Sequence, residues 1–260
     1  MLNVIPKKNL LGLTLSALIS TQALAVDVMI DVYYTPEAEK RSFDIKTEIS
    51  NMISTSNQYY ANNGLEIELK LVAEPYGLST NYIASDLSVD RSAYGIESVY
   101  KNRSIRNWRD EYKADFVTVL GSRAPYPGGG YICGIAGDIY GMGINPTDYK
   151  RYQSYAYNIT ATDCGNATMT FVHELGHNMG LGHSVKQGAV GGVYDYGVGY
   201  GVDYEFSTIM GYPHEFNTTN QLAVFSNPDR TCESNYACGR SDADAQKALK
   251  LVTEKIAAFR

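Results

Sequence analysis

The chain has 260 residues, 44% of them hydrophobic and 19% charged, and a formal net charge of −6 at pH 7. A chain of this length can bury the core of one sizeable globular domain. The acidic excess disfavours nucleic-acid binding, because such binding depends on a basic surface. Acidic side chains also intersperse a cluster of basic residues, which we interpret as a solvated helix face: Arg103, Arg106, Arg109 and Lys113.

The N-terminus has the pattern of an export signal. Lys7 and Lys8 precede a short apolar stretch, Leu10–Ile19, and Ala23-Leu24-Ala25 fits a signal-peptidase site. The apolar stretch is too short to span a bilayer as a stable helix, and no other stretch is apolar enough. We therefore expect a signal peptide over residues 1–25, one domain over residues 26–260, no membrane span, and a secreted or periplasmic protein.

The first half of the expected domain alternates strands with helices. Val26–Tyr34 is rich in β-branched and aromatic residues and predicts a strand. Thr35 can cap a helix that continues to about Asn62, and Asn63-Gly64 is a turn signal. The alternation of apolar and charged residues over Leu65–Ala73 predicts a half-buried strand.

The middle of the chain continues this alternation. Ser92–Lys113 is expected to be helical in its later part, and the short apolar segment Phe116–Leu120 is expected to be a central strand. A Pro/Gly-rich loop then leads into Tyr131–Ala136, and Tyr152–Thr160 is a further candidate strand.

The second half looks less regular. Tyr194–Tyr200 is rich in glycine and tyrosine, and it is either an irregular segment packed by its own aromatic rings or a cleft wall. Ser241 and Asp244 resemble the start of a capped helix that ends near Phe259. The whole pattern predicts an α/β (α+β) domain with a cleft between two lobes.

Four cysteines in an exported chain predict two disulfides, for which three pairings are possible. We favour Cys133 with Cys164, which would tie a strand to the segment before residue 167, and Cys232 with Cys238, which would close a short loop. Neither spacing resembles a zinc cluster, so a structural role is favoured.

The segment from residue 173 to residue 183 reads His-Glu-Leu-Gly-His-Asn-Met-Gly-Leu-Gly-His and contains three of the four histidines. On a helix over residues 167–179, His173 and His177 lie one turn apart and can reach the same metal ion. Gly180 is suited to end that helix in a left-handed conformation. The chain can then turn back, which allows His183 to be a third ligand.

Three neutral histidines leave one position of a tetrahedral zinc ion open for water, which is typical of a catalytic site. One zinc ion would lower the pKa of that water to about 7. Glu174 follows the first ligand and is well placed to take the water's proton and pass it to a leaving amine. An amphipathic helix with surface histidines would explain His173 and His177, but not the spacing of Gly180 and His183.

These residues, followed by Ser207–Pro213, resemble the metzincin metallopeptidases, whose signature joins this histidine pattern to a Met-turn. The resemblance implies a two-lobed catalytic domain with a twisted mixed sheet, helices above a zinc-bearing helix, and a smaller irregular C-terminal lobe. It also implies that Met210 forms an apolar base beneath the ligands. Tyr212 matches a zinc-associated tyrosine of astacins and serralysins, whose phenol would stabilise an oxyanion; alternatively, it is one packed tyrosine among 22.

Within the metzincins, two sequence features point in different directions. The Gly-Leu-Gly-His-Ser wording around His183 is similar to matrixins. The opening stretch Asp27–Pro36 and the segment Phe225–Pro228 look more like bacterial reprolysin-like and peptidyl-Asp metalloendopeptidases, and this comparison fits best.

The resemblance implies a secreted zinc endopeptidase, which we expect to be a monomer. A protein or peptide substrate would lie extended in the cleft, with Tyr131–Ala136 as the edge strand that binds its backbone. Two alternatives are a catalytically silent binding module on a protease fold and a zinc amidase acting on cell-wall peptides. Glu174 argues against the silent module, which has no chemical need for a base.

Overall fold

The computed structural model describes residues 25–72, 93–125, 129–137 and 153–260. The expected signal peptide lies outside the described residues apart from Ala25. Ala73, Ser92 and Tyr152, which are terminal residues of three expected elements, also lie outside them.

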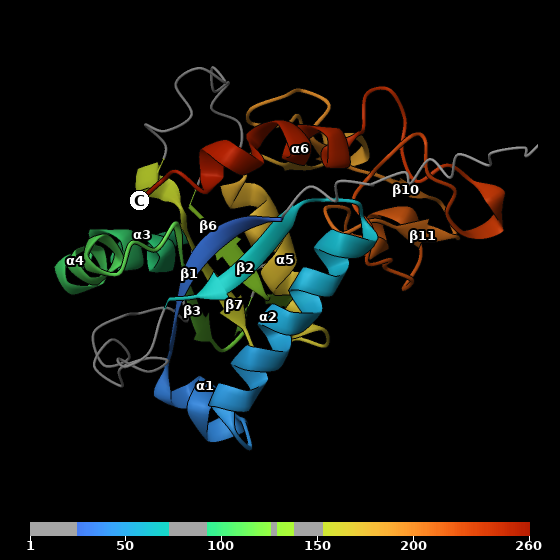
Figure 1. Ribbon diagram of the computed structural model, residues 1–260. Helices are drawn as coiled ribbons and strands as arrows, with labels where there is room; N and C mark the ends of the chain where they lie inside the picture. Colours follow the sequence, from blue (N-terminus) through green and yellow to red (C-terminus); the bar gives the residue numbers. More distant parts are fainter. Residues whose placement is uncertain (1–24, 73–92, 126–128, 138–152) are drawn as a thin grey trace, which may run out of the picture.

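A five-stranded twisted sheet forms the centre of the molecule (Figure 1). Its strands are β1 (Val26–Tyr34), β2 (Ile67–Leu71), β3 (Phe116–Gly121), β6 (Gly134–Ala136) and β7 (Tyr157–Ala161). They are arranged in the order β2-β1-β3-β7-β6. Neighbours pair in parallel from β2 to β7, whereas the edge strand β6 is antiparallel to β7. The sheet is therefore mixed, and the apolar segment expected to be central is its middle strand.

Helices cover both faces of this sheet (Figure 1). The helices α2 (Ile45–Asn62), α5 (Ala167–Asn178) and α6 (Ala245–Ile256) contribute apolar side chains to the larger hydrophobic core on one face. The helices α3 (Ala93–Lys101) and α4 (Arg103–Glu111) cover a second core cluster on the opposite face. Burial on both faces explains why the middle strand β3 is apolar apart from Thr118. The expected fold class is confirmed.

A capping side chain divides one expected helix in two, and another starts the helix expected in the later part of residues 92–113, which is preceded by a helix that was not expected. The helix expected from residue 36 to Asn62 consists of α1 (Pro36–Arg41) and α2, because the Asp44 carboxylate accepts hydrogen bonds from two backbone N–H groups of α2 and starts a new helix. Asn102 divides α3 from α4 in the same way. At the C-terminal helix the cap is Asp244, so α6 begins after Asp244 rather than near Ser241.

Arg109 does not belong to a solvated helix face, contrary to the sequence interpretation. Its side chain is fully buried, and its guanidinium donates hydrogen bonds to the carbonyl groups of Ala114, Asp115 and Gln153. It also lies over the ring of Tyr157, 4.8 Å from the centroid. Three carbonyl acceptors compensate the loss of hydration, so this arginine fastens α4 to the end of the sheet.

The chain after α5 is less regular, as expected for a smaller C-terminal lobe. Tyr194 and Tyr196 stack with 5.5 Å between ring centroids and pack against the core, which favours the self-packed interpretation of their segment. The short elements are β8 (Gly182–Ser184), β9 (Val198–Gly199), β10 (Gly201–Val202), β11 (Phe206–Ser207) and 3-10 helices at Val185–Gln187, Pro213–Phe216 and Glu233–Asn235.

Two disulfides join the pairs favoured from the sequence. The Cα atoms of Cys133 and Cys164 are 5.7 Å apart, and those of Cys232 and Cys238 are 5.1 Å apart. Cys133 lies between β6 and the short strand β5 (Tyr131–Ile132), which pairs with β4 (Ala124–Pro125). The strand expected over residues 131–136 is therefore two strands, tied by a disulfide to the segment before α5.

Within the described ranges, no helix has both the length and the apolar character that crossing a membrane requires.

An acidic side chain is buried in the middle of β1. Asp31 is 8% exposed and accepts a hydrogen bond from the Tyr33 hydroxyl, whose ring stacks on Trp108 of α4. Burial raises the pKa of Asp31 from 3.8 to about 6, against the opposing effect of hydrogen bonds from Tyr33 and from the backbone of Val32. The ionised carboxylate is therefore less favourable in the folded protein than in the unfolded chain.

Replacing Asp31 by Asn should increase the free energy of unfolding more at pH 7 than at pH 4. Because the folded state holds the Asp31 proton more tightly, wild-type stability falls as pH rises from 3.8 to about 6, by at most about 3 kcal/mol. Urea unfolding at the two pH values measures this difference, with Asp27→Asn as the exposed control in the same strand. An equal effect of Asp31→Asn at both pH values would contradict the perturbed carboxyl group.

Candidate active site

The helix α5 begins and ends as its sequence requires. The Asn166 side chain caps it by accepting a hydrogen bond from the Met169 N–H. At the other end, the Leu181 N–H donates to Gly176 O and the Gly180 N–H donates to His177 O, which is a Schellman motif. Gly180 has a φ of +89°, in the left-handed region that glycine adopts without strain. The chain therefore reverses at Gly180, as the sequence predicted.

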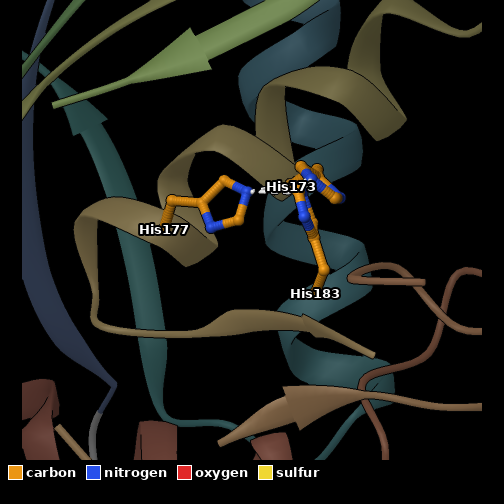
Figure 2. A group of neighbouring side chains, drawn as sticks. All are labelled: His173, His177 and His183. Atoms are coloured by element: carbon orange, nitrogen blue, oxygen red, sulfur yellow. Dashed lines mark hydrogen bonds between the residues drawn. The ribbon is translucent and has the colours of Figure 1, made fainter. Parts of the chain in front are cut away.

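This reversal brings three imidazole rings together (Figure 2). His173 and His177 extend from α5, and His183 extends from β8. Their Nε2 atoms form a triangle with sides of 3.1 Å, 3.1 Å and 3.2 Å. Three nitrogens bound to one zinc ion at 2.0–2.1 Å in tetrahedral directions would be roughly 3.3 Å apart. The triangle therefore has the size of a metal site.

The hydrogen bonds of the same rings support a metal site. The His173 Nδ1 atom lies 2.7 Å from the carbonyl oxygen of Ile209, and the His177 Nδ1 atom lies 2.9 Å from that of Leu181. A carbonyl oxygen only accepts, so both Nδ1 atoms carry hydrogen and both neutral rings present lone pairs at Nε2. Two facing lone pairs repel each other, and a shared cation removes the repulsion. The donor set therefore fits a bound metal ion.

The local environment keeps these rings uncharged. Burial, together with the charge of the neighbouring His183, lowers the pKa of His173 from 6.5 to about 4. Burial also lowers the pKa of His183 to about 4, and that of His177 well below 6.5. Neutral imidazole is the form that binds metal ions, so the site is prepared for one near neutral pH.

Met210 lies directly beneath the histidine-bearing helix. Its side chain is fully buried, and a Cβ atom placed on Gly176 would lie 2.5 Å from the Met210 sulfur. The absence of a side chain at Gly176 therefore makes room for the methionine between two of the histidines. The preceding residue, Ile209, supplies the carbonyl that orients His173. This arrangement matches an apolar base under the ligands.

Glu174 is the acidic group of the site. It is 5% exposed, and burial raises the pKa of its carboxyl group from 4.5 to about 8. Its carboxyl group lies against Gly134 of the edge strand β6, where a Cβ atom would approach its Oε1 atom to 2.4 Å. The carboxyl group is thus enclosed between α5 and the strand that borders the cleft.

Two cavities meet at this carboxyl group. The larger, of about 670 Å³, extends past β5 toward His173 and His214, and the smaller, of about 480 Å³, extends past β6 toward His177 and His183. Gly134, Glu174 and Tyr212 line both cavities. Together the cavities provide space for a chain on either side of the histidine cluster.

Tyr212 is close to the histidines, as its position after Met210 predicted. Its ring centroid is 4.4 Å from that of His183 and 5.7 Å from that of His173, and the residue is 38% exposed. Its backbone N–H donates to the Gln187 side chain, 3.2 Å away. The phenol therefore belongs to the wall shared by both cavities.

Sequence reasoning missed Asn178, which fastens the ligand helix to the sheet. Its buried side-chain amide donates to the carbonyl groups of Tyr157, Tyr155 and Gly137 at 3.0 Å, 3.1 Å and 3.3 Å. Its side-chain oxygen accepts from Asn158 at 3.0 Å. The sequence signal for this role was an asparagine directly after His177, on a helix whose apolar face packs against the core.

Comparisons with protein families identify related chains. A family model described as metallo-peptidase family M12B reprolysin-like matches residues 46–184, more than half of the chain. A model for peptidase M66 matches residues 156–248.

Two curated relatives are both named peptidyl-Asp metalloendopeptidase. The protein from Pseudomonas aeruginosa is 35% identical, over 98% of this chain and 44% of its own length. The protein from Xanthomonas campestris pv. campestris is 26% identical, over 80% of this chain and 45% of its own length. The chain thus spans less than half the length of these relatives.

A solved structure described as a chaperone-substrate complex has a similar fold, with a TM-score of 0.67 and 20% sequence identity. The similarity covers 91% of this chain and 35% of that chain. Taken together, the family match and the relatives show that this chain belongs to the reprolysin-like M12B metallopeptidase family.

Proposed function

We propose that this chain is a zinc-dependent endopeptidase in which His173, His177 and His183 hold the ion and Glu174 acts as general base and acid. The observation that carries the proposal is the triangle of Nε2 atoms, two of them with facing lone pairs, beside a buried carboxyl group. Family membership supports the metallopeptidase chemistry, and three imidazole ligands favour zinc.

The proposed division of labour follows from the positions of the side chains. A bound zinc ion would supply an acidified water and polarise the scissile carbonyl group. The nearby cation would favour the ionised form of Glu174, opposing the effect of burial, and this carboxylate would take a proton from that water and deliver it to the leaving nitrogen. The Tyr212 phenol, on the shared wall of the two cavities, would donate a hydrogen bond to the developing oxyanion.

The edge strand β6 supports an extended peptide as substrate. Cys133 O and Gly137 N bond to strand β7 on one side. Hydrogen bonds alternate along antiparallel strands, so the N–H and C=O groups of Gly134 and Ala136 are directed to the other side, toward the cleft. A peptide can add there as a further strand, with its scissile bond near Glu174.

The names of the two relatives lead us to propose cleavage next to aspartyl residues. Arg123 and Arg41 both pair with Asp163, so this cluster keeps one net positive charge. The Arg123 guanidinium lies 4.0 Å from the ring centroid of Tyr131, which lines the larger cavity. This cation would attract an acidic substrate side chain to that side of the cleft.

We also propose that the chain is exported and that residues 1–25 are removed as a signal peptide. The two disulfides support an oxidising location outside the cytoplasm.

Replacing His183 by Ala should weaken zinc affinity by more than about 100-fold, because one of three direct ligands is lost. Loss of a residue that only hydrogen-bonds to a metal ligand typically weakens metal affinity by about 10–100-fold. Competition with a chelator, followed by metal analysis, measures the affinity. His214→Ala is the matched control, because this exposed histidine lies outside the cluster. Undiminished zinc retention by His183→Ala would refute the three-histidine site.

Replacing Glu174 by Gln should keep zinc and lower kcat by about 10²–10⁴-fold, because the amide keeps the shape of the side chain but cannot carry the proton. The assay is digestion of a diverse peptide mixture read by mass spectrometry, which also reports whether cuts fall beside aspartate. Turnover equal to wild type would remove Glu174 as the base. If zinc-loaded wild type makes no cuts, the silent binding module or the cell-wall amidase becomes the better description.

Replacing Tyr212 by Phe should lower kcat by about 10²-fold with little change in KM, because the lost hydrogen bond forms mainly in the transition state. Steady-state kinetics on one peptide substrate provide the test, with Tyr204→Phe as the control at an exposed tyrosine. A change confined to KM would instead assign Tyr212 to substrate binding.

A further inference from the structure

At Gly134, the edge strand β6 lies closer to the Glu174 side chain than it could if residue 134 carried a side chain. A Cβ atom at position 134 would lie 2.4 Å from Oε1, 2.6 Å from Cγ and 2.7 Å from Cδ of Glu174. All three distances are well inside van der Waals contact, which is about 3.5–4.0 Å between carbon atoms. A methyl group and the Glu174 carboxyl group therefore cannot both occupy their places.

The strand side of this contact is held firmly. Cys133, directly before Gly134, forms a disulfide with Cys164, and its carbonyl oxygen accepts a 2.7 Å hydrogen bond from the Ala161 N–H. At the other end of β6, the Gly137 N–H donates to Tyr157 O at 2.7 Å. Moving the strand away from α5 would strain a disulfide and break backbone hydrogen bonds.

The carboxyl side of the contact is easier to move. Glu174 has three rotatable side-chain bonds, and rotation about the first of them, Cα–Cβ, moves Cγ, Cδ and Oε1 together. Its backbone, in contrast, is fixed in α5, whose next turn is fastened to the sheet through Asn178. A methyl group at position 134 would therefore displace the carboxylate by about an ångström, while the fold and the three histidines remain in place.

We propose that Gly134 is a positioning residue: its missing side chain lets β6 hold the Glu174 carboxylate at the point where the two cavities meet. Strand β6 would thus have two roles at Gly134: it would bind the substrate backbone, and it would set the position of the general base. This inference rests on the proposed role of Glu174. Gly134 takes no part in the reaction itself, but it determines the position of the Glu174 carboxylate.

The test begins with Gly134→Ala. A base displaced by about 1 Å is expected to lower kcat by about 10²-fold, with little change in KM. Zinc stoichiometry and melting temperature should stay at wild-type values. Gly165→Ala is the matched control, because a Cβ atom there meets nothing within 4 Å and the residue is also next to a cysteine of the same disulfide. That control should keep wild-type kcat.

A double-mutant cycle separates positioning from a general disturbance of the cleft. Glu174→Ala removes all three atoms that the added Cβ atom would meet, Cγ, Cδ and Oε1. The Gly134→Ala change should therefore lower the remaining kcat much less in the Glu174→Ala background than it lowers kcat in wild type. Equal fold-losses in the two backgrounds would overturn the proposal.

A crystal structure of Gly134→Ala provides a readout that does not depend on activity. A displaced carboxylate beside an unmoved β6 supports the proposal, and a displaced β6 beside an unmoved carboxylate overturns it. The proposed function can fail separately: if Glu174→Gln were fully active, the carboxylate shift would still be seen in the crystal while the catalytic proposal would be lost.

Discussion

The repulsion between unprotonated imidazole nitrogens is the constraint on which the rest of this site depends. His173 and His177 present lone pairs to each other across 3.1 Å, because each ring uses its Nδ1 hydrogen on a backbone carbonyl. Both rings are held in this arrangement by their hydrogen bonds to backbone carbonyl groups and by burial of the helix that bears them. A metal ion converts the unfavourable arrangement into a favourable one, so folding and metal binding are coupled.

The parts of the site that are close in sequence could be predicted from the sequence. The two histidines one helical turn apart, the glycine that reverses the chain and the third histidine all lie within eleven residues, and local geometry alone brings them together. Strand Phe116–Gly121 could likewise be predicted, because burial on both faces favours a run of apolar residues, here interrupted only by Thr118.

Features set by contacts between distant segments could not be predicted in this way. Arg109 lies among charged neighbours in the sequence, and its burial depends on carbonyl groups as far away as Gln153. Gly134 and Glu174 are forty residues apart, so their close approach follows only from the pairing of β6 beside β7. The caps at Asp44 and Asn102 had a recognisable local signal, but a continuous helical pattern ran across them and concealed it.

The hydrogen bond from His173 to Ile209 has a consequence for the order in which the protein matures. The two partners are 36 residues apart, one on the ligand helix and the other in the C-terminal lobe. Until that lobe has folded, the Ile209 carbonyl group is not in place to fix which nitrogen of His173 carries the hydrogen. The N-terminal half alone would therefore present His173 in mixed tautomers and bind metal more weakly, although the local contact with Leu181 still fixes the tautomer of His177. Metal binding at this site would then come late in maturation, after both lobes have docked.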